Sequence, residues 1–161
     1  MERAGALPLT RTEVQPEWLD YNHHMNDAAY AVLFSRGIDV LMDLIGLDSD
    51  GRARHSRTLY TLDMHLRYAR ECREGDPLNV EMQLLDWDAK RLHLMMGAWV
   101  DEHDAPLAAT AEIMLMCIDS DAIRGAAFPV TVSERIADLW GAHQDLPRPA
   151  ELDRGIGIRR D

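Results

Sequence analysis

Apolar and polar positions change their spacing several times along the chain, and each change marks a predicted element. From Asn26 onward the apolar residues recur at helical spacing, with polar residues on the opposite side. Asn26 suits an N-cap, Asp27 the positive end of the helix dipole and Gly46 the position after the last turn. The pattern predicts a helix of about 20 residues, roughly 30 Å long, whose apolar stripe needs a large partner surface. The stripe consists of Tyr30, Leu33, Phe34, Gly37, Ile38, Leu41, Leu44 and Ile45.

Four stretches after this helix alternate apolar and polar residues with a period of two, which is typical of strands. They centre on residues 60–68, 78–84, 92–100 and 107–118, and short turns separate them. We expect the apolar set of the first stretch to face the helix. This set consists of Tyr60, Leu62, Met64, Leu66 and Tyr68. We expect the polar set to lie on a solvated or polar interface. This set includes Asp63, His65, Arg67, Glu81, Gln83 and His93.

The two ends of the chain complete the predicted fold. Residues 7–14 predict one more strand before the helix, and Thr131 with Glu134 has the spacing of a capping box that opens a short helix at about 131–145. The tail after this helix is expected to be extended. Strands at hairpin spacing favour an antiparallel meander, so the expected class is α+β in a single domain, 1–161, with its core at about 7–120. A long central helix wrapped by a five-stranded antiparallel sheet is the hotdog arrangement.

Composition narrows the classes of partner. With 17 Lys and Arg against 28 Asp and Glu, the net charge is −11, so neither nucleic acid nor an anionic membrane is an expected partner. An anionic ligand held by a local arginine cluster remains compatible with this charge. Cys72 and Cys117 show neither a disulfide framework nor a metal-binding spacing, and they fit a reducing cytoplasm. The first residues lack the apolar core of a signal peptide, and no apolar run is long enough to cross a membrane.

The segment DYNHHMNDAAY, residues 20–30, gathers more groups that hold or move protons than a helix start requires. The helix itself accounts for Asn26 and Asp27, which cap it and complement its dipole. Adjacent His23 and His24 point in different directions, and no second group lies at a metal-binding spacing. No metal site is therefore expected.

Catalysis is the interpretation that uses the residues ahead of the helix. Free N–H groups at a helix start stabilise an oxyanion, and a carboxylate just upstream can attack a thioester or ester carbonyl or activate a water. Asp20 occupies that position, and Asn22 and His24 are candidates for orienting Asp20, the water or the leaving thiol. The alternative for His24 is a packed histidine that only hydrogen-bonds the loop.

This segment resembles the signature of the 4-hydroxybenzoyl-CoA thioesterase group of hotdog enzymes, D-x-N-G-H-M-N-N-x-x-Y. The matching residues are Asp20, Asn22, His24, Met25, Asn26 and Tyr30. His23 stands in place of the usual glycine and Asp27 in place of the usual asparagine, so His23 brings the loop shape into question. The resemblance implies that Asp20 is the catalytic carboxylate and that the backbone N–H groups of Asp27 and Ala28 polarise the thioester oxygen.

The resemblance extends over about residues 13–160 to one subgroup, the thioesterase found beside or fused to carnitine dehydrogenase in bacteria. It is carried by residues 20–48, 58–96 and the tail GIGIRR at 155–160. It implies hydrolysis of a short acyl-CoA thioester, with betainyl-CoA converted to glycine betaine as the expected reaction. Coenzyme A enters as part of the substrate, and no separate cofactor is expected. A homodimer with active sites at its interface is expected because long edge strands otherwise stand open, and a tetramer remains an alternative.

A trimethylammonium group binds to aromatic faces and carboxylates, and CoA phosphates bind to a basic rim. The substrate-binding candidates are Asp63, Trp87 and Trp99, followed by Tyr60, Tyr68 and Glu112. The CoA-binding candidates are Arg67, Arg70, Arg73, Lys90 and Arg91. The alternatives are core packing for the tyrosines and a solvated charged edge for the basic residues.

Three other functions remain open from the sequence. One is a hotdog thioesterase for another short, branched or aromatic acyl-CoA. Another is a hydratase or dehydratase, whose related pattern D-x-N-P-x-H has its histidine five residues after the aspartate. Here His24 lies four residues after Asp20 and no proline intervenes, which counts against that reaction. The third is a non-catalytic acyl-CoA-binding or regulatory domain.

Overall fold

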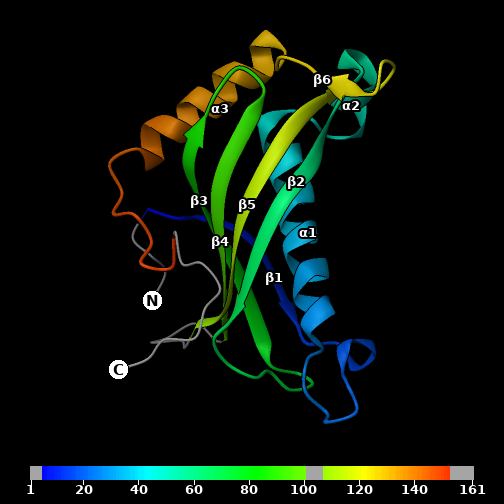
Figure 1. Ribbon diagram of the computed structural model, residues 1–161, viewed down its shortest axis with the longest axis vertical. Helices are drawn as coiled ribbons and strands as arrows, with labels where there is room; N and C mark the ends of the chain where they lie inside the picture. Colours follow the sequence, from blue (N-terminus) through cyan, green and yellow to red (C-terminus); the bar gives the residue numbers. More distant parts are fainter. Residues whose placement is uncertain (1–4, 101–106, 153–161) are drawn as a thin grey trace.

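The computed structural model describes residues 5–100 and 107–152 (Figure 1). In chain order the elements are β1 (Leu7–Glu13), the 3-10 turn η1 (Pro16–Trp18), α1 (Asp27–Ile45), α2 (Ser49–His55), β2 (Arg57–Tyr68), β3 (Pro77–Trp87), β4 (Arg91–Val100), β5 (Leu107–Asp119), β6 (Arg124–Gly125) and α3 (Val130–His143). The long strands form one antiparallel sheet in the order β1-β3-β4-β5-β2, with β6 paired to β5.

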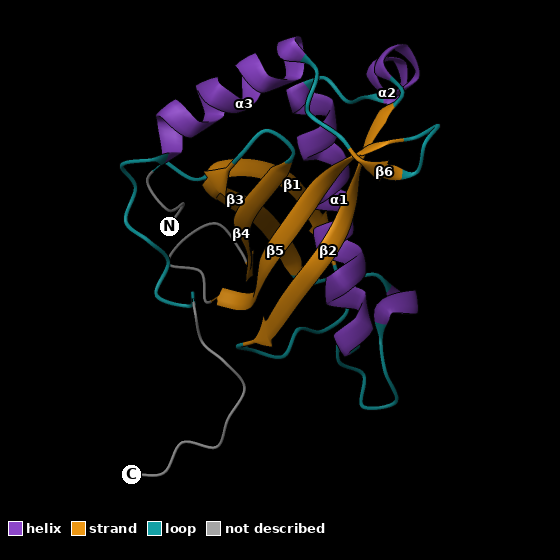
Figure 2. Ribbon diagram, turned by 45° about the horizontal axis from the view of Figure 1, so that its top comes forward, coloured by secondary structure: helices purple, strands orange, loops and turns teal. Residues whose placement is uncertain are grey.

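The sheet curls around α1, and α3 crosses the end where β3 turns into β4 (Figure 2). The predicted α+β hotdog fold is confirmed. None of the described helices has the length and apolarity to cross a membrane.

The central helix forms as its sequence predicts. The side chain of Asn26 accepts a hydrogen bond from the Ala28 N–H, and Gly46, with φ 87°, ends the helix in the left-handed region. At Gly37 an added Cβ would lie 3.3 Å from a methyl group of Leu9 and 3.4 Å from the sulfur of Met96, so this glycine allows the helix to approach the sheet closely. One apolar position of the stripe was predicted wrongly, since Leu44 is 50% exposed.

Strand β2 changes face part-way along its length. Leu62 has no partner in the ladder with β5, although Thr61 and Asp63 on either side of it are paired, so the strand bulges there. Tyr60 and Leu62 are 46% and 52% exposed, and the expectation that they face α1 is wrong. One extra residue shifts the period-two pattern by one, which carries Tyr60 to the face away from the helix. After the bulge, the side chains facing α1 are those of Met64, Leu66 and Tyr68.

Two helices depart from the sequence prediction. Helix α2 was not predicted, because its seven residues, SDGRARH, carry no apolar stripe. Its N-cap Asp48 accepts a hydrogen bond of 2.7 Å from the Gly51 N–H. The C-terminal helix is confirmed, but its capping box is wrong, since α3 begins at Val130 after Pro129 and Thr131 lies inside it. The Pro129 carbonyl accepts the first bonds of this helix, and no side chain caps it.

The face of the sheet away from α1, called the outer face below, is partly covered by the end of α3 and the segment that follows it. The Leu84 N–H donates to Nδ1 of His143 at 2.9 Å, and Gln83 donates to the carbonyl of Pro147 at 3.3 Å. Leu152 packs with Leu85 and Met95 in a small second core. The outer face is therefore not solvated over β3, where Gln83 is only 7% exposed and makes a polar contact with the segment after α3.

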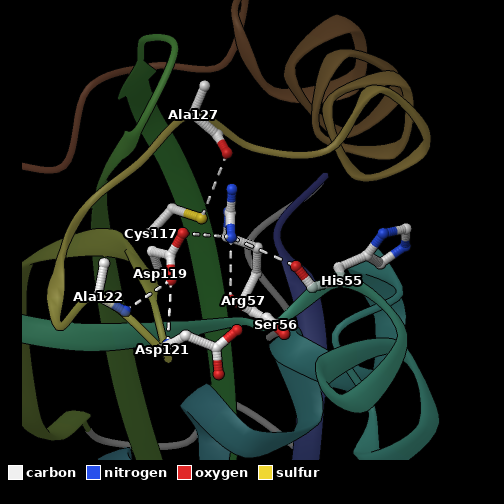
Figure 3. Close-up of polar contacts among 8 residues, drawn as sticks. All are labelled: His55, Ser56, Arg57, Cys117, Asp119, Asp121, Ala122 and Ala127. Carbon is white, nitrogen blue, oxygen red and sulfur yellow. Dashed lines mark hydrogen bonds and ion pairs between the residues drawn. The ribbon is translucent and has the colours of Figure 1, made fainter.

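An ion pair joins the start of β2 to the end of β5 (Figure 3). Arg57 donates from Nη1 to Asp119 at 3.0 Å and to the carbonyls of His55 and Ser56 at 3.3 and 3.0 Å. The pKa of Asp119 is lowered, first by the hydrogen bond from the Ala122 N–H and further by the Arg57 charge. These contacts fix the end of the sheet opposite to the loop that precedes α1 (Figure 1).

Candidate active site

The loop before α1 folds back on itself so that its two ends lie side by side. Leu19 and Met25 form an isolated antiparallel bridge, and the Asp20 N–H donates to the His24 carbonyl at 2.8 Å. Met25 is 5% exposed, and its N–H donates to the carbonyl of Cys72 at 2.7 Å. The loop is therefore anchored by the buried side chain of Met25 and by the backbone hydrogen bond from Met25 to the segment after β2.

His23 adopts the conformation for which the related pattern uses glycine. Its φ is 61°, in the left-handed region, and its N–H donates to the Asp20 carbonyl at 3.0 Å. The loop therefore makes a left-handed turn at this position although histidine stands in place of glycine. A side chain in this region carries a strain of about 1 kcal/mol.

The carboxylate of Asp20 is oriented by the backbone of its own loop. Its Oδ1 accepts hydrogen bonds from the N–H groups of Asn22 and His24, at 2.7 and 3.2 Å. Its second oxygen, Oδ2, takes no part in these two bonds. The sequence suggested the side chains of Asn22 and His24 for this task, whereas the contacts come from their main chains. The His24 ring instead lies 3.4 Å from the carboxylate of Glu71.

A pocket of about 380 Å³ opens between this loop, the start of α1 and the end of β2. Its lining residues are Asp20, Asn22, His24, Met25, Asp27, Tyr30, Tyr68, Ala69, Arg70 and Glu71. The Ala28 N–H is engaged by the side-chain oxygens of Asn26 and Asp27, both at 2.9 Å. No described residue accepts a hydrogen bond from the Asp27 N–H. The first N–H of α1 therefore remains open to an acceptor at the pocket.

Two tyrosines support the floor of this pocket. The Tyr30 hydroxyl donates to the Arg70 carbonyl at 3.3 Å, and the Tyr68 hydroxyl donates to the Asp27 carbonyl at 3.2 Å. Their rings meet edge to face, with centroids 5.3 Å apart and planes at 73°. Burial raises the pKa of both phenols, with a further contribution from Cys72 for Tyr30 and from the Asp27 charge for Tyr68. Both side chains are therefore neutral donors near neutral pH.

Among the CoA-binding candidates, only Arg70 lines the Asp20 pocket. Arg73 shares a neighbouring hollow with Arg70. Arg67 lies on the outer face of β2, paired with Thr110. Lys90 lies in the β3–β4 turn at the far end of the sheet (Figure 1), and Arg91, the first residue of β4, is bonded there to Asp88.

The first three substrate-binding candidates, Asp63, Trp87 and Trp99, do not line the Asp20 pocket. Asp63 and Trp99 lie on the outer face, and Trp87 packs against the main core near the β3–β4 turn. Glu112 is bonded to His93 at 2.9 Å. Of the aromatic candidates, only Tyr68 reaches the pocket.

Glu71 is a pocket residue that the sequence prediction missed. It follows β2 in a segment without periodicity, and its side chain is 76% exposed. The signal that points to it is its place directly after the end of a strand that packs on the start of α1. Within the described residues, no group of three or more His, Cys, Asp or Glu side chains is arranged to hold a metal ion.

A family model described as the thioesterase-like superfamily matches residues 14–136, which include the Asp20 loop, α1 and strands β2 to β5. The chain belongs to this superfamily. The predicted family and the predicted chemistry, thioester hydrolysis, are confirmed. Within this thioesterase, the Asp20 loop and the first turn of α1 lie inside the matched range.

Two curated proteins are similar to this thioesterase over most of its length. It is 41% identical over 152 residues to betainyl-CoA thioesterase of Pseudomonas aeruginosa, a match covering 94% of this chain and 95% of that protein. It is 33% identical over 164 residues to L-carnitine dehydrogenase/betainyl-CoA thioesterase of Rhizobium meliloti. The second match covers 99% of this chain but 32% of the other protein, so it falls on one part of a longer chain.

Two solved structures share the fold along nearly the whole chain. A hypothetical protein of Staphylococcus aureus, determined in complex with CoA, superposes with a TM-score of 0.88 at 32% identity and covers 96% of this chain and 97% of its own. A putative thioesterase of Pseudomonas putida gives a TM-score of 0.83 at 35% identity and covers 96% and 98% of the two chains. The shared fold therefore extends beyond the helix and sheet that carry the pocket.

The thioesterase pocket combines two groups that acyl transfer requires. A carboxylate stands at its mouth with one oxygen fixed by two N–H groups, and the open N–H of Asp27 lies at the positive end of α1. A thioester carbonyl seated between them has a base or nucleophile beside its carbon and a donor beside its oxygen.

Proposed function

We propose that this thioesterase hydrolyses a short acyl-CoA thioester, and that betainyl-CoA, cleaved to glycine betaine and CoA, is its substrate. The observation that carries the proposal is the Asp20 carboxylate, oriented by two backbone N–H groups beside the open N–H of α1. The similarity to a betainyl-CoA thioesterase over 94% of the chain supports the acyl group. The CoA complex of a structural neighbour supports the thiol portion.

In the proposed reaction Asp20 acts at the carbonyl carbon while the Asp27 N–H donates to the carbonyl oxygen. As a general base, Asp20 takes a proton from water, and the hydroxide adds to the carbon. As a nucleophile, it adds to the carbon directly and forms an anhydride that water then cleaves. Both routes expel the CoA thiolate, which takes up a proton, and both place negative charge on the oxygen at the helix start.

The proposal places two protomers edge to edge through β2. This strand of 12 residues has β5 on one side only. A two-fold axis pairs two such edges antiparallel, which brings the start of one β2 beside the end of the other. Since Tyr68 at the end of β2 lines the pocket, each active site then lies at the interface. The partner subunit is also the proposed source of those CoA-binding and substrate-binding candidates that lie far from Asp20.

The primary test is the release of free thiol from a panel of short, branched, aromatic and cationic acyl-CoA thioesters. We expect betainyl-CoA to be the preferred substrate, and Asp20→Asn to lower kcat by at least about a hundredfold because the base or nucleophile is lost. Asp39→Asn, an exposed carboxylate further along α1, is the matched control and should keep wild-type turnover. Wild-type turnover by Asp20→Asn would remove Asp20 from the reaction.

The same panel distinguishes the other functions. Hydration of crotonyl-CoA without thiol release would favour a hydratase, and no turnover of any thioester would favour a binding domain. A single turnover in heavy-oxygen water separates the two roles of Asp20, because only the nucleophilic route leaves the label in its carboxylate.

A further inference from the structure

Asp27 places a carboxylate where the related pattern has asparagine, directly beside the N–H group proposed to hold the oxyanion. Negative charge at this point opposes the charge that develops on the carbonyl oxygen. Capping does not require it, because Asn26 already accepts from the same Ala28 N–H that Asp27 engages. Its interaction with the helix dipole stabilises α1, but an asparagine would leave the fold in place at a small loss. The carboxylate therefore calls for an explanation in the reaction.

A cationic acyl group supplies that explanation. In betainyl-CoA a single methylene separates the quaternary nitrogen from the carbonyl carbon. Any side chain close to the carbonyl is therefore also close to the positive charge. A trimethylammonium group donates no ordinary hydrogen bond, and proteins bind it with aromatic faces and negative charge. With a neutral ester, a carboxylate here only repels the developing oxyanion. With betainyl-CoA, the same carboxylate also attracts the quaternary ammonium group.

The pocket holds an aromatic ring beside this carboxylate. Tyr68 is 52% exposed, and its hydroxyl donates to the backbone carbonyl of Asp27 at 3.2 Å. The edge-to-face contact with buried Tyr30 fixes the plane of the Tyr68 ring. Glu71 adds a third carboxylate to the lining, after Asp20 and Asp27, although its oxygen lies 3.4 Å from the His24 ring. Arg70 is the opposing charge in this lining, and its exposed position suits the CoA phosphates.

Resting on the proposed function, we infer that Asp27 and Tyr68 form the recognition site for a quaternary ammonium group on the acyl chain. Asp27 is the specificity-determining residue of this site and attracts the cation. Tyr68 provides the aromatic face and is positioned by its hydrogen bond to the Asp27 carbonyl and its ring contact with Tyr30. Neutral acyl groups of the same shape bind without this attraction. The Asp27 carboxylate then repels the negative charge that develops on their carbonyl oxygen during the reaction.

The test compares betainyl-CoA with 3,3-dimethylbutyryl-CoA, in which carbon replaces the quaternary nitrogen without changing the shape of the acyl group. The wild-type enzyme should prefer the cationic ester in kcat/KM. Asp27→Asn should lower this preference by at least about fivefold, through a loss on betainyl-CoA and a gain on the neutral ester, whose oxyanion is no longer repelled. Asp39→Asn, an exposed carboxylate of the same helix outside the pocket lining, should leave the preference unchanged.

Two variants of Tyr68 separate its ring from its hydroxyl. Both Tyr68→Phe and Tyr68→Leu lose the bond to Asp27, but only Tyr68→Leu loses the aromatic face. We expect Tyr68→Leu to lower the preference for betainyl-CoA further than Tyr68→Phe does. Equal preferences in these two variants would overturn the role of the ring.

The outcomes separate this inference from the proposed function on which it rests. An unchanged preference in Asp27→Asn, or an equal loss on both esters, overturns the inference and leaves Asp27 as a residue of the helix start. A wild-type enzyme that prefers the neutral ester also overturns it, while its thioesterase activity stands. A wild-type enzyme that hydrolyses neither ester contradicts the proposed substrate, and the inference fails with it.

Discussion

His23 adopts a left-handed backbone conformation at a position where the related pattern has glycine. Its φ of 61° is the conformation in which glycine is least strained, and its N–H bond to Asp20 closes the turn. The turn brings the N–H groups of Asn22 and His24 to the Asp20 carboxylate. The geometry of the candidate site is therefore maintained against a local strain.

Replacing His23 by glycine should relieve this strain and stabilise the protein. We expect a net gain of about 0.5 kcal/mol in the free energy of unfolding, because the relief of strain exceeds the entropy that glycine adds to the unfolded chain. Urea unfolding measures the change. Tyr21→Gly in the same loop is the control, since Tyr21 is 91% exposed and its φ is not positive. It should lose stability, and a loss in His23→Gly as well would show that the loop is not strained at His23.

Some residues of the site can be predicted from their spacing to the start of the helix, and others cannot. Asp20 and the cap Asn26 could be predicted, because each stands at a fixed distance from a helix start that periodicity defines. Tyr68 could be named only as one of several aromatic candidates, and Glu71 was missed, because the place of both depends on where the end of β2 packs. Sequence spacing carries no information about that long-range contact.

The long helix and the long strands follow from periodicity, and the departures occur where the periodicity is shifted or absent. The bulge at Leu62 leaves the alternation of apolar residues intact in sequence while it reverses their faces in space. Helix α2 has no apolar stripe, and α3 begins at a proline rather than at the threonine that resembles a cap. These features depend on tertiary packing and backbone conformation, which a binary pattern does not encode.

The β3–β4 turn depends on one carboxylate, which gives it a dependence on pH. Asp88 accepts from the Arg91 side chain at 2.8 Å, and this bond, with the Lys90 N–H, lowers the pKa of Asp88 to about 2. A lowered pKa in the folded state stabilises the protein above the ordinary pKa of aspartate, and this contribution is lost as the pH falls toward 2.

Replacing Asp88 by asparagine removes the charge and keeps an acceptor for the turn. We expect a loss of less than about 1 kcal/mol at neutral pH, because solvent screens this exposed pair. The difference from the wild type should shrink between about pH 5 and pH 2. Urea unfolding across this range measures it, with Asp39→Asn as the exposed control. A difference independent of pH would show that the Asp88 charge contributes nothing to the turn.

Strand β2 stands at the edge of the sheet, where its outer side is not paired with any other described strand. Pairing of two β2 edges would cover this strand and place both pockets at the interface. The apolar side chains exposed along the strand, Tyr60, Leu62 and Tyr68, are consistent with that contact. The described part of the tail occupies part of the outer face instead, where Leu152 packs on Leu85 and Met95. The edge and the outer face are thus different surfaces, and only the edge adjoins the active site.

A charge at Leu62 should separate the protomers. Leu62→Lys places an ammonium group on the β2 edge, and we expect it to convert a dimer into a monomer of 18.3 kDa in light scattering. Leu44→Lys is the matched control, because Leu44 on α1 is 50% exposed and Leu62 is 52% exposed. The control should remain dimeric and active. Since the proposed site needs both protomers, the Leu62→Lys monomer should also lose thiol release, and an active monomer would show that each chain carries a complete site.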